Sequence, residues 1–160
     1  MQVFYRKTQS GWLILFSLIP VLVFLAFLLY RQQIWGRSFG EEASPFWLFP
    51  VLLVFFFILL ALFATLTVSG FQDHLEIKFG IGVIRKRFYY KDIHSCSVKK
   101  NSFIYGWGIR AIPGGWLYNV AGLWSVQLDM KSGKTYRVGT PEPEKLEQFI
   151  RSRLSLYAGS

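Results

Sequence analysis

The hydrophobic positions are unevenly distributed, and two long apolar stretches fill much of the first half of the chain. Residues 11–30 contain no charged side chain, and residues 43–72 contain none either. At about 1.5 Å rise per residue, twenty helical residues span the roughly 30 Å hydrocarbon core of a bilayer. The pattern predicts transmembrane helices at about residues 11–30 and 46–69, which together make a transmembrane hairpin within residues 1–72.

The first apolar stretch also has a feature of a signal peptide, because Arg6 and Lys7 precede it. We favour a membrane helix, since the stretch is long and no small-x-small cleavage site follows Tyr30. A buried hairpin inside a soluble protein is disfavoured, because too little chain remains to cover two such helices. The composition, 52% hydrophobic and 19% aromatic, agrees with a membrane protein.

Beyond residue 72 the pattern changes to alternation of apolar and polar residues, which is typical of half-buried strands. His74-Leu75-Glu76-Ile77-Lys78-Phe79 is the clearest case. We predict strands at residues 74–79, 83–90, 93–99, 107–111, 117–120, 125–130 and 135–138. Residues 73–160 are therefore expected to form a separate, mostly β domain.

The last part of the chain has a different period and predicts a helix. Thr140 is suited to the N-cap and Pro141 to the first helical position. Apolar residues then recur at i, i+3, i+4 and i+8, which gives one apolar face. They are Leu146, Phe149, Ile150 and Leu154. We expect this C-terminal helix to pack on the sheet.

Two segments carry a family resemblance: "KDIHSCSVKKNSFIYGWGIRAIPGGWLYNVAG" and "VQLDMKSGKTYRVGTPEPEKLEQFI". Over residues 70–155 the chain resembles small bacterial membrane proteins that join two transmembrane helices to a cytoplasmic pleckstrin-homology-like (PH-like) domain. The resemblance implies a mostly β barrel or sandwich with a C-terminal capping helix, attached to the membrane. It implies no catalytic motif.

The charge distribution predicts the orientation in the membrane. The net charge is +9, and fourteen of the eighteen basic residues follow residue 72. Two basic residues lie between the predicted helices, whereas six flank their outer ends, and Lys and Arg concentrate on the cytoplasmic side of membrane proteins. We therefore expect an integral protein of the plasma (cytoplasmic) membrane with both termini in the cytoplasm. The single cysteine, Cys96, agrees with a reducing compartment.

Three sequence patterns suggest a chemical site, but none of them meets the requirements of that site. The glycine-rich residues 105–119 lead into β-prone residues, so we interpret their glycines as strand and turn devices rather than a phosphate cradle. Ser132-Gly133-Lys134-Thr135 lacks the first glycine of a P-loop. His94 and Cys96, two apart on a strand, would face the same way but are too few for a zinc site. With no paired carboxylates either, we expect no enzyme, metal or cofactor.

Basic residues are the strongest functional lead. On the second strand, if Ile84 and Phe88 face the core, Arg85 and Arg87 share the outer face and Lys86 lies on the inner one. The candidate contacts for anionic lipid headgroups are Arg85, Lys86, Arg87, Lys99, Lys100 and Arg110.

These residues predict a membrane-anchored binding module that recognises lipid headgroups or a protein partner at the inner membrane surface. The alternative is a structural or accessory subunit that forms a homo-oligomer or joins a larger membrane complex. Nucleic acid is disfavoured as a partner, because the domain is tethered to a membrane. A channel is disfavoured too, because the predicted spans contain no ionisable residue that would mark a pathway.

Overall fold

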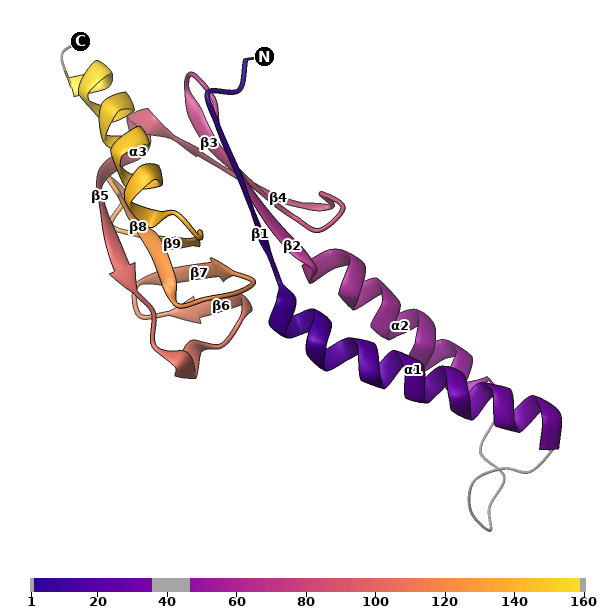
Figure 1. Ribbon diagram of the computed structural model, residues 1–160. Coiled ribbons are helices and arrows are strands. Elements are labelled where there is room, and N and C mark those ends of the chain that lie inside the picture. Colours follow the sequence, from indigo (N-terminus) through magenta and orange to yellow (C-terminus); the bar gives the residue numbers. More distant parts are fainter. Residues whose placement is uncertain (1, 36–46, 159–160) are drawn as a thin grey trace.

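A computed structural model describes residues 2–35 and 47–158 of the chain (Figure 1). The helices are α1 (Trp12–Trp35), α2 (Leu48–Phe63) and α3 (Pro143–Ala158), with 3-10 turns at Tyr90–Asp92 and Phe103–Tyr105. The strands are β1 (Tyr5–Ser10), β2 (Thr65–Gly70), β3 (His74–Phe79), β4 (Ile84–Tyr89), β5 (Ile93–Lys100), β6 (Gly108–Ile112), β7 (Gly115–Asn119), β8 (Trp124–Met130) and β9 (Thr135–Gly139). They form two sheets, ordered β1-β2-β3-β4 and β5-β8-β9-β7-β6.

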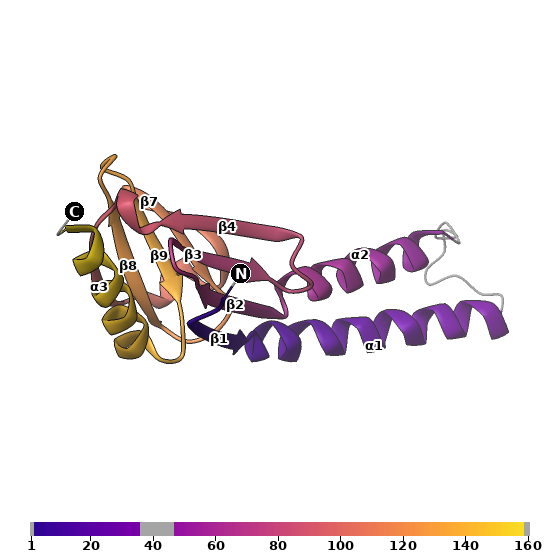
Figure 2. The ribbon, with the colours of Figure 1, turned by 90° about the horizontal axis from the view of Figure 1, so that it is seen from above.

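The helices α1 and α2 lie side by side and project from one end of the β domain, while α3 lies at the opposite end (Figures 1 and 2). Within the described residues, α1 alone is long and apolar enough to cross a membrane. Its segment Trp12–Arg31 has 20 residues, a mean hydropathy of 2.8 and only 6% of its length buried. The 16 residues of α2 rise about 24 Å, which is less than the roughly 30 Å core of a bilayer.

The prediction of a second helix through residue 69 is wrong at its C-terminal end. The helix ends at Phe63, and the next residues form strand β2. Thr65, Thr67 and Val68 are β-branched and favour a strand, but the absence of charge hid this change of structure in the sequence. The predicted start at Phe46 lies outside the described residues.

The strand β1 precedes α1 and was not predicted. It pairs antiparallel with β2, so that Tyr5 lies opposite Gly70 and Ser10 opposite Thr65. The first sheet therefore takes half of its strands from residues that we assigned to the transmembrane hairpin. The expected boundary between residues 72 and 73 does not follow the sheet, because β2 also pairs with β3 across it.

The second sheet explains the glycines of residues 105–119. β6 and β7 form a hairpin whose turn contains Gly114 at φ +79°, a conformation that favours glycine. β7 then runs parallel to β9, and a Cβ atom on Gly115 would lie 1.5 Å from the carbonyl oxygen of Thr135. Glycine thus permits the predicted turn at Gly114, and at Gly115 it permits a close approach of a second backbone that was not predicted there.

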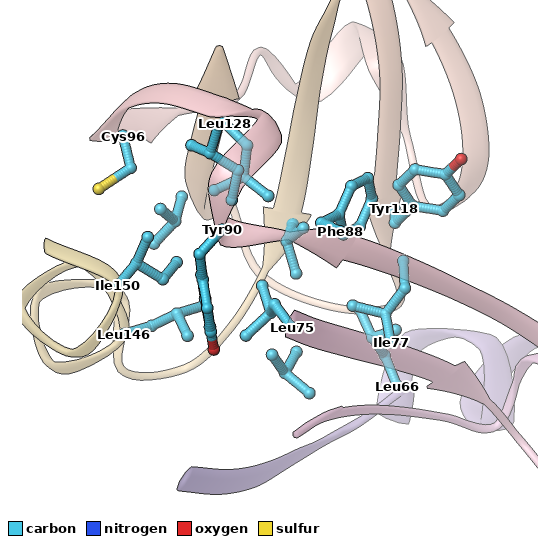
Figure 3. Packing of buried hydrophobic residues seen from close by; sticks show 14 of the residues in the cluster. Leu66, Leu75, Ile77, Phe88, Tyr90, Cys96, Tyr118, Leu128, Leu146 and Ile150 are labelled. Atoms are coloured by element: carbon cyan, nitrogen blue, oxygen red, sulfur yellow. The ribbon is translucent and has the colours of Figure 1, made fainter. Parts of the chain in front are cut away.

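The hydrophobic core lies between the two sheets and α3 (Figure 3). Leu75 and Phe88 reach it from the first sheet and Leu128 from the second. Leu146 and Ile150 of α3 are fully buried in it, which confirms the predicted packing of the C-terminal helix. Fully burying an aliphatic side chain stabilises the fold by about 1.5–3 kcal/mol, so this core holds the domain together.

The predicted strands after residue 72 all occur, with ends that differ by at most two residues. The C-terminal helix begins at Pro143 instead of Pro141. Thr140 still accepts a hydrogen bond from the backbone N–H of Glu142, at 3.3 Å. The sequence therefore predicted a mostly β domain with a C-terminal helix correctly, but not its first two strands.

Candidate functional site

The outer face of the first sheet carries a polar hollow that we call the basic groove. Its volume is about 310 Å³. In the strand register Arg6 lies opposite Ser69, and Thr67 and Arg85 lie on either side of Lys78. Three cations and two hydroxyl groups from all four strands therefore line one hollow. Its lining residues are Val3, Arg6, Thr67, Ser69, Phe71, Lys78, Gly80, Ile81, Gly82 and Arg85.

The turn between β3 and β4 lies beside the end of α2 (Figure 2), and its residues 80–82 line the groove. The backbone N–H of Gly80 donates to the carbonyl of Thr65 at 2.8 Å, and that of Ile81 donates to Ala61 at 3.3 Å. In the same turn the side chains of Ile81 and Val83 are 73% and 70% exposed. Exposed apolar side chains at the end of a lipid-compatible helix suit contact with a membrane surface.

The helices are joined firmly to the domain, so the position of the groove relative to them is fixed. Phe63, the last residue of α2, packs edge-on against Phe79 of β3, with ring centroids 5.9 Å apart. Ile14, in the first turn of α1, also packs against the core. Because β1 and β2 adjoin the helices with only one residue between, little freedom remains at the junction.

One carboxylate, Glu76, balances part of the charge on this face. It is only 3% exposed and binds Lys78 at 2.9 Å and Arg87 at 2.8 Å. Burial alone would raise the pKa of Glu76, but the hydrogen bonds from Arg87 and Lys78 outweigh burial and hold its pKa below the ordinary value. Glu76 is therefore ionised, and each of its carboxylate oxygens already binds a cationic side chain.

Two cations of the groove have no carboxylate partner among the described residues. Arg85 donates from Nε to the carbonyl oxygen of Gly82, which leaves its terminal nitrogens for another acceptor. Arg6 forms no ion pair within the described part of the chain. A guanidinium with free terminal N–H groups is suited to bidentate binding of a phosphate.

The structure separates the three predicted cations of β4 as the alternation indicated. Ile84 and Phe88 point inward, and Arg85 and Arg87 lie on the outer face. Lys86 lies on the inner side, with Nζ 5.8 Å from the centre of the Tyr136 ring. Only Arg85 belongs to the basic groove, since Arg87 is held by Glu76.

The other predicted contacts lie on the second sheet. Lys99 and Lys100 are exposed at the end of β5, where Lys100 Nζ lies 5.9 Å from the centre of the Trp124 ring. Arg110 lies on β6. The six candidates therefore do not form one site. Sequence reasoning missed Arg6 and Lys78, and the alternation of β3, which sets Lys78 on the outer face, was a signal for the second of these.

The structure also places the two motifs that we excluded as a P-loop and as a zinc site. Ser132-Gly133-Lys134-Thr135 forms the turn from β8 to β9 and the first residue of β9, not a helix start. His94 is exposed while Cys96 is buried, because a register shift between Ile93 and Ser95 breaks the alternation that we expected. Burial raises the pKa of the Cys96 thiol to about 11, so it is a poor nucleophile at neutral pH. No group of metal ligands occurs among the described residues.

Comparison with known proteins gives no family. No protein-family model matches the chain, and no curated protein matches its sequence. The resemblance to PH-like membrane proteins therefore has no support from a family match. The function has to be inferred from the residues of the site.

Proposed function

We propose that the protein is a membrane-anchored, PH-like binding module whose basic groove recognises anionic phospholipid headgroups at the cytoplasmic surface of the plasma membrane. The observation that carries the proposal is the place of the groove. It opens beside the end of α2, in a turn with two exposed apolar side chains, and it contains cations that have no carboxylate partner among the described residues.

Strand pairing supports two crossings of the membrane. β1 leads into α1, and β2 follows α2, yet β1 and β2 are antiparallel partners. If α1 crosses the bilayer, the chain must cross back before β2. The described helix in that interval is α2, so we assign the second crossing to α2. Both termini then lie on one side.

The charges favour the cytoplasmic leaflet as that side. Arg6, Lys7 and the basic residues after β2 all belong to the β domain, so they act together on the orientation. Anionic lipids of this leaflet attract each nearby Lys or Arg by about 1 kcal/mol. Because the Debye length is about 8 Å at physiological salt, only cations held close to the surface benefit. The basic groove meets this condition through its link to α2.

A competing function is that of a structural or accessory subunit. The helix α2 has no buried residue within the described structure, so its apolar surface is available to lipid or to other helices. This reading predicts an assembly of defined copy number, or a complex with another membrane protein, without preference for anionic lipid.

The test compares lipid binding of the full chain in detergent micelles, using native mass spectrometry. Phosphatidylglycerol and phosphatidylcholine are titrated against the wild type and against the double variant Arg6→Ala, Arg85→Ala. We expect phosphatidylglycerol affinity to fall about ten-fold or more in the variant, and to weaken with salt in the wild type.

The matched control is Lys131→Ala with Lys134→Ala, which removes two cations at the distant turn between β8 and β9. It should keep the wild-type affinity. Equal losses in both double variants would mean a diffuse positive surface and would reject a defined site. A fixed oligomer with no lipid preference would favour the structural subunit.

A further inference from the structure

A second hollow, which we call the junction pocket, lies where the two helices meet the second sheet. Its volume is about 400 Å³. Residues from the first turns of α1 and the last turns of α2 form one wall, and the start of β6 forms the other. The lining residues are Ile14, Ser17, Leu18, Leu59, Phe63 and the segment 107–110.

The two walls of the junction pocket differ in chemistry. The helical wall is almost wholly aliphatic and aromatic, with Ser17 as its one polar side chain. The strand wall presents Arg110, whose Nε donates to the carbonyl oxygen of Trp107 at 3.2 Å. Its terminal nitrogens have no ion-pair partner among the described residues. The pocket is thus largely apolar, and the terminal guanidinium nitrogens of Arg110 are available on its strand wall.

The indole of Trp107 also belongs to the strand wall and is held in place by two contacts. Its Nε1–H donates to the carbonyl oxygen of Gly122 at 3.3 Å, and its ring packs edge-on against Phe103 at 5.3 Å between centroids. Tryptophan with one apolar and one polar edge is enriched at the membrane–water interface. This wall therefore has the composition of a membrane interface.

We propose that the junction pocket binds one phospholipid, with its phosphate at Arg110 and an acyl chain against α1 and α2. The depth agrees with this occupant, because α1 begins at Trp12 and the pocket therefore lies where α1 enters the bilayer. A phospholipid has its phosphate at this depth and its chains directly below. The proposal requires α1 to be in the membrane but does not depend on lipid binding by the basic groove.

The test uses the full chain in nanodiscs of phosphatidylcholine that contain a photoreactive phosphatidylcholine with a diazirine near the start of one acyl chain. This lipid is zwitterionic, so it avoids any preference of the basic groove for anionic headgroups. After irradiation, mass spectrometry maps the labelled residues. We expect the label to concentrate at residues 14–18 and 59–63.

Two variants make the test specific. Ser17→Trp fills the pocket from an exposed helical position, and Arg110→Ala removes the phosphate contact; each should lower labelling at these positions about ten-fold. Val23→Trp, at a 63% exposed position further along α1, is the control and should label as the wild type does. Even labelling along α1, or wild-type labelling in Arg110→Ala, would overturn the proposal.

Discussion

Glu76 is the residue on which the charge balance of the outer sheet face depends. Both of its oxygens are occupied, one by Lys78 and the other by Arg87, and the carboxylate is nearly inaccessible to solvent. Its two partners are partly exposed, so each ion pair is weaker than a fully buried one. Glu76 stabilises the sheet and neutralises Lys78 and Arg87, which under the proposed function would otherwise attract anionic lipid.

Glu76→Gln should therefore have opposite effects on stability and on lipid binding. At neutral pH we expect a loss of about 1 kcal/mol or more in unfolding free energy, because two hydrogen bonds to a charge are weakened. Affinity for phosphatidylglycerol should rise, since Lys78 and Arg87 are released. Thermal unfolding of the detergent-solubilised chain and the native mass-spectrometric titration measure the two effects.

The pH dependence of this stability difference has a definite sign. The pKa of Glu76 is lowered in the folded state from its ordinary 4.5. The stability from the ionised carboxylate is therefore complete above about pH 4.5 and is lost as the pH falls through the lowered folded value. The stability gap between wild type and Glu76→Gln should narrow over that acid range. A gap that stays constant as the pH falls well below 4.5 would show that ionisation of Glu76 is not its cause.

Among the elements, α3 joins the two sheets and also contacts the N-terminal strand. Phe149 stacks on Tyr5 of β1, with ring centroids 5.4 Å apart, and a Cβ atom on Gly70 of β2 would lie 2.1 Å from the same ring. Lys7 of β1 forms an ion pair with Glu142, just before α3. The C-terminal helix therefore holds in place the strand that carries Arg6.

Leu146→Ala should destabilise the full chain by about 2–5 kcal/mol, because the Leu146 side chain of α3 is fully buried in the core. Gln148→Ala, on the exposed side of the same helix, should change stability by less than about 0.5 kcal/mol. Thermal unfolding in detergent is the measurement. Equal stability of both variants would contradict the docking of α3.

The helices and strands also show which parts of the fold can be predicted from local sequence patterns. Local patterns predicted β3 to β9 and α3, because alternation and the apolar stripe are properties of neighbouring residues. β1 was missed because its sequence, YRKTQS, has no apolar alternation and depends on a partner some sixty residues away. β2 was hidden in an uncharged run. Two arginines of the groove have no carboxylate partner among the described residues. One of them, Arg6, belongs to β1, so local sequence patterns did not identify it.

At the scale of the whole molecule, the paired strands β1 and β2 make the topology testable. Cysteines introduced one at a time at Ser38 and Ser160, both outside the described residues, test the two sides of the membrane in intact cells. The native Cys96 is buried, so it should not interfere. A membrane-impermeant thiol reagent should label the Ser38→Cys variant and spare Ser160→Cys. Labelling of Ser160→Cys from outside would contradict cytoplasmic termini.

The strand pairing has a further consequence for how the domain is studied. A fragment of residues 73–160 would lack β1 and β2, and β2 both pairs with β3 beside Leu75 and Ile77 and supplies Leu66 and Val68 to the core. Without these strands, apolar side chains of the core would be exposed to solvent. Stability and the proposed lipid binding should therefore be measured on the full chain in a membrane or in detergent.

In the proposed function the guanidinium groups of Arg6 and Arg85 contact lipid phosphates, and magic-angle-spinning NMR measures this contact directly. The full chain, with ¹⁵N only in its arginines, is placed in phosphatidylglycerol-containing bilayers, and ¹⁵N–³¹P dephasing of the guanidinium signals is recorded. The double variant Arg6→Lys, Arg85→Lys keeps the charge but removes two labelled groups, so dephasing should drop. Arg151→Lys with Arg153→Lys, on α3 at the end of the domain away from α1 and α2, should leave it unchanged. Undiminished dephasing in the Arg6, Arg85 variant would contradict phosphate binding in the basic groove.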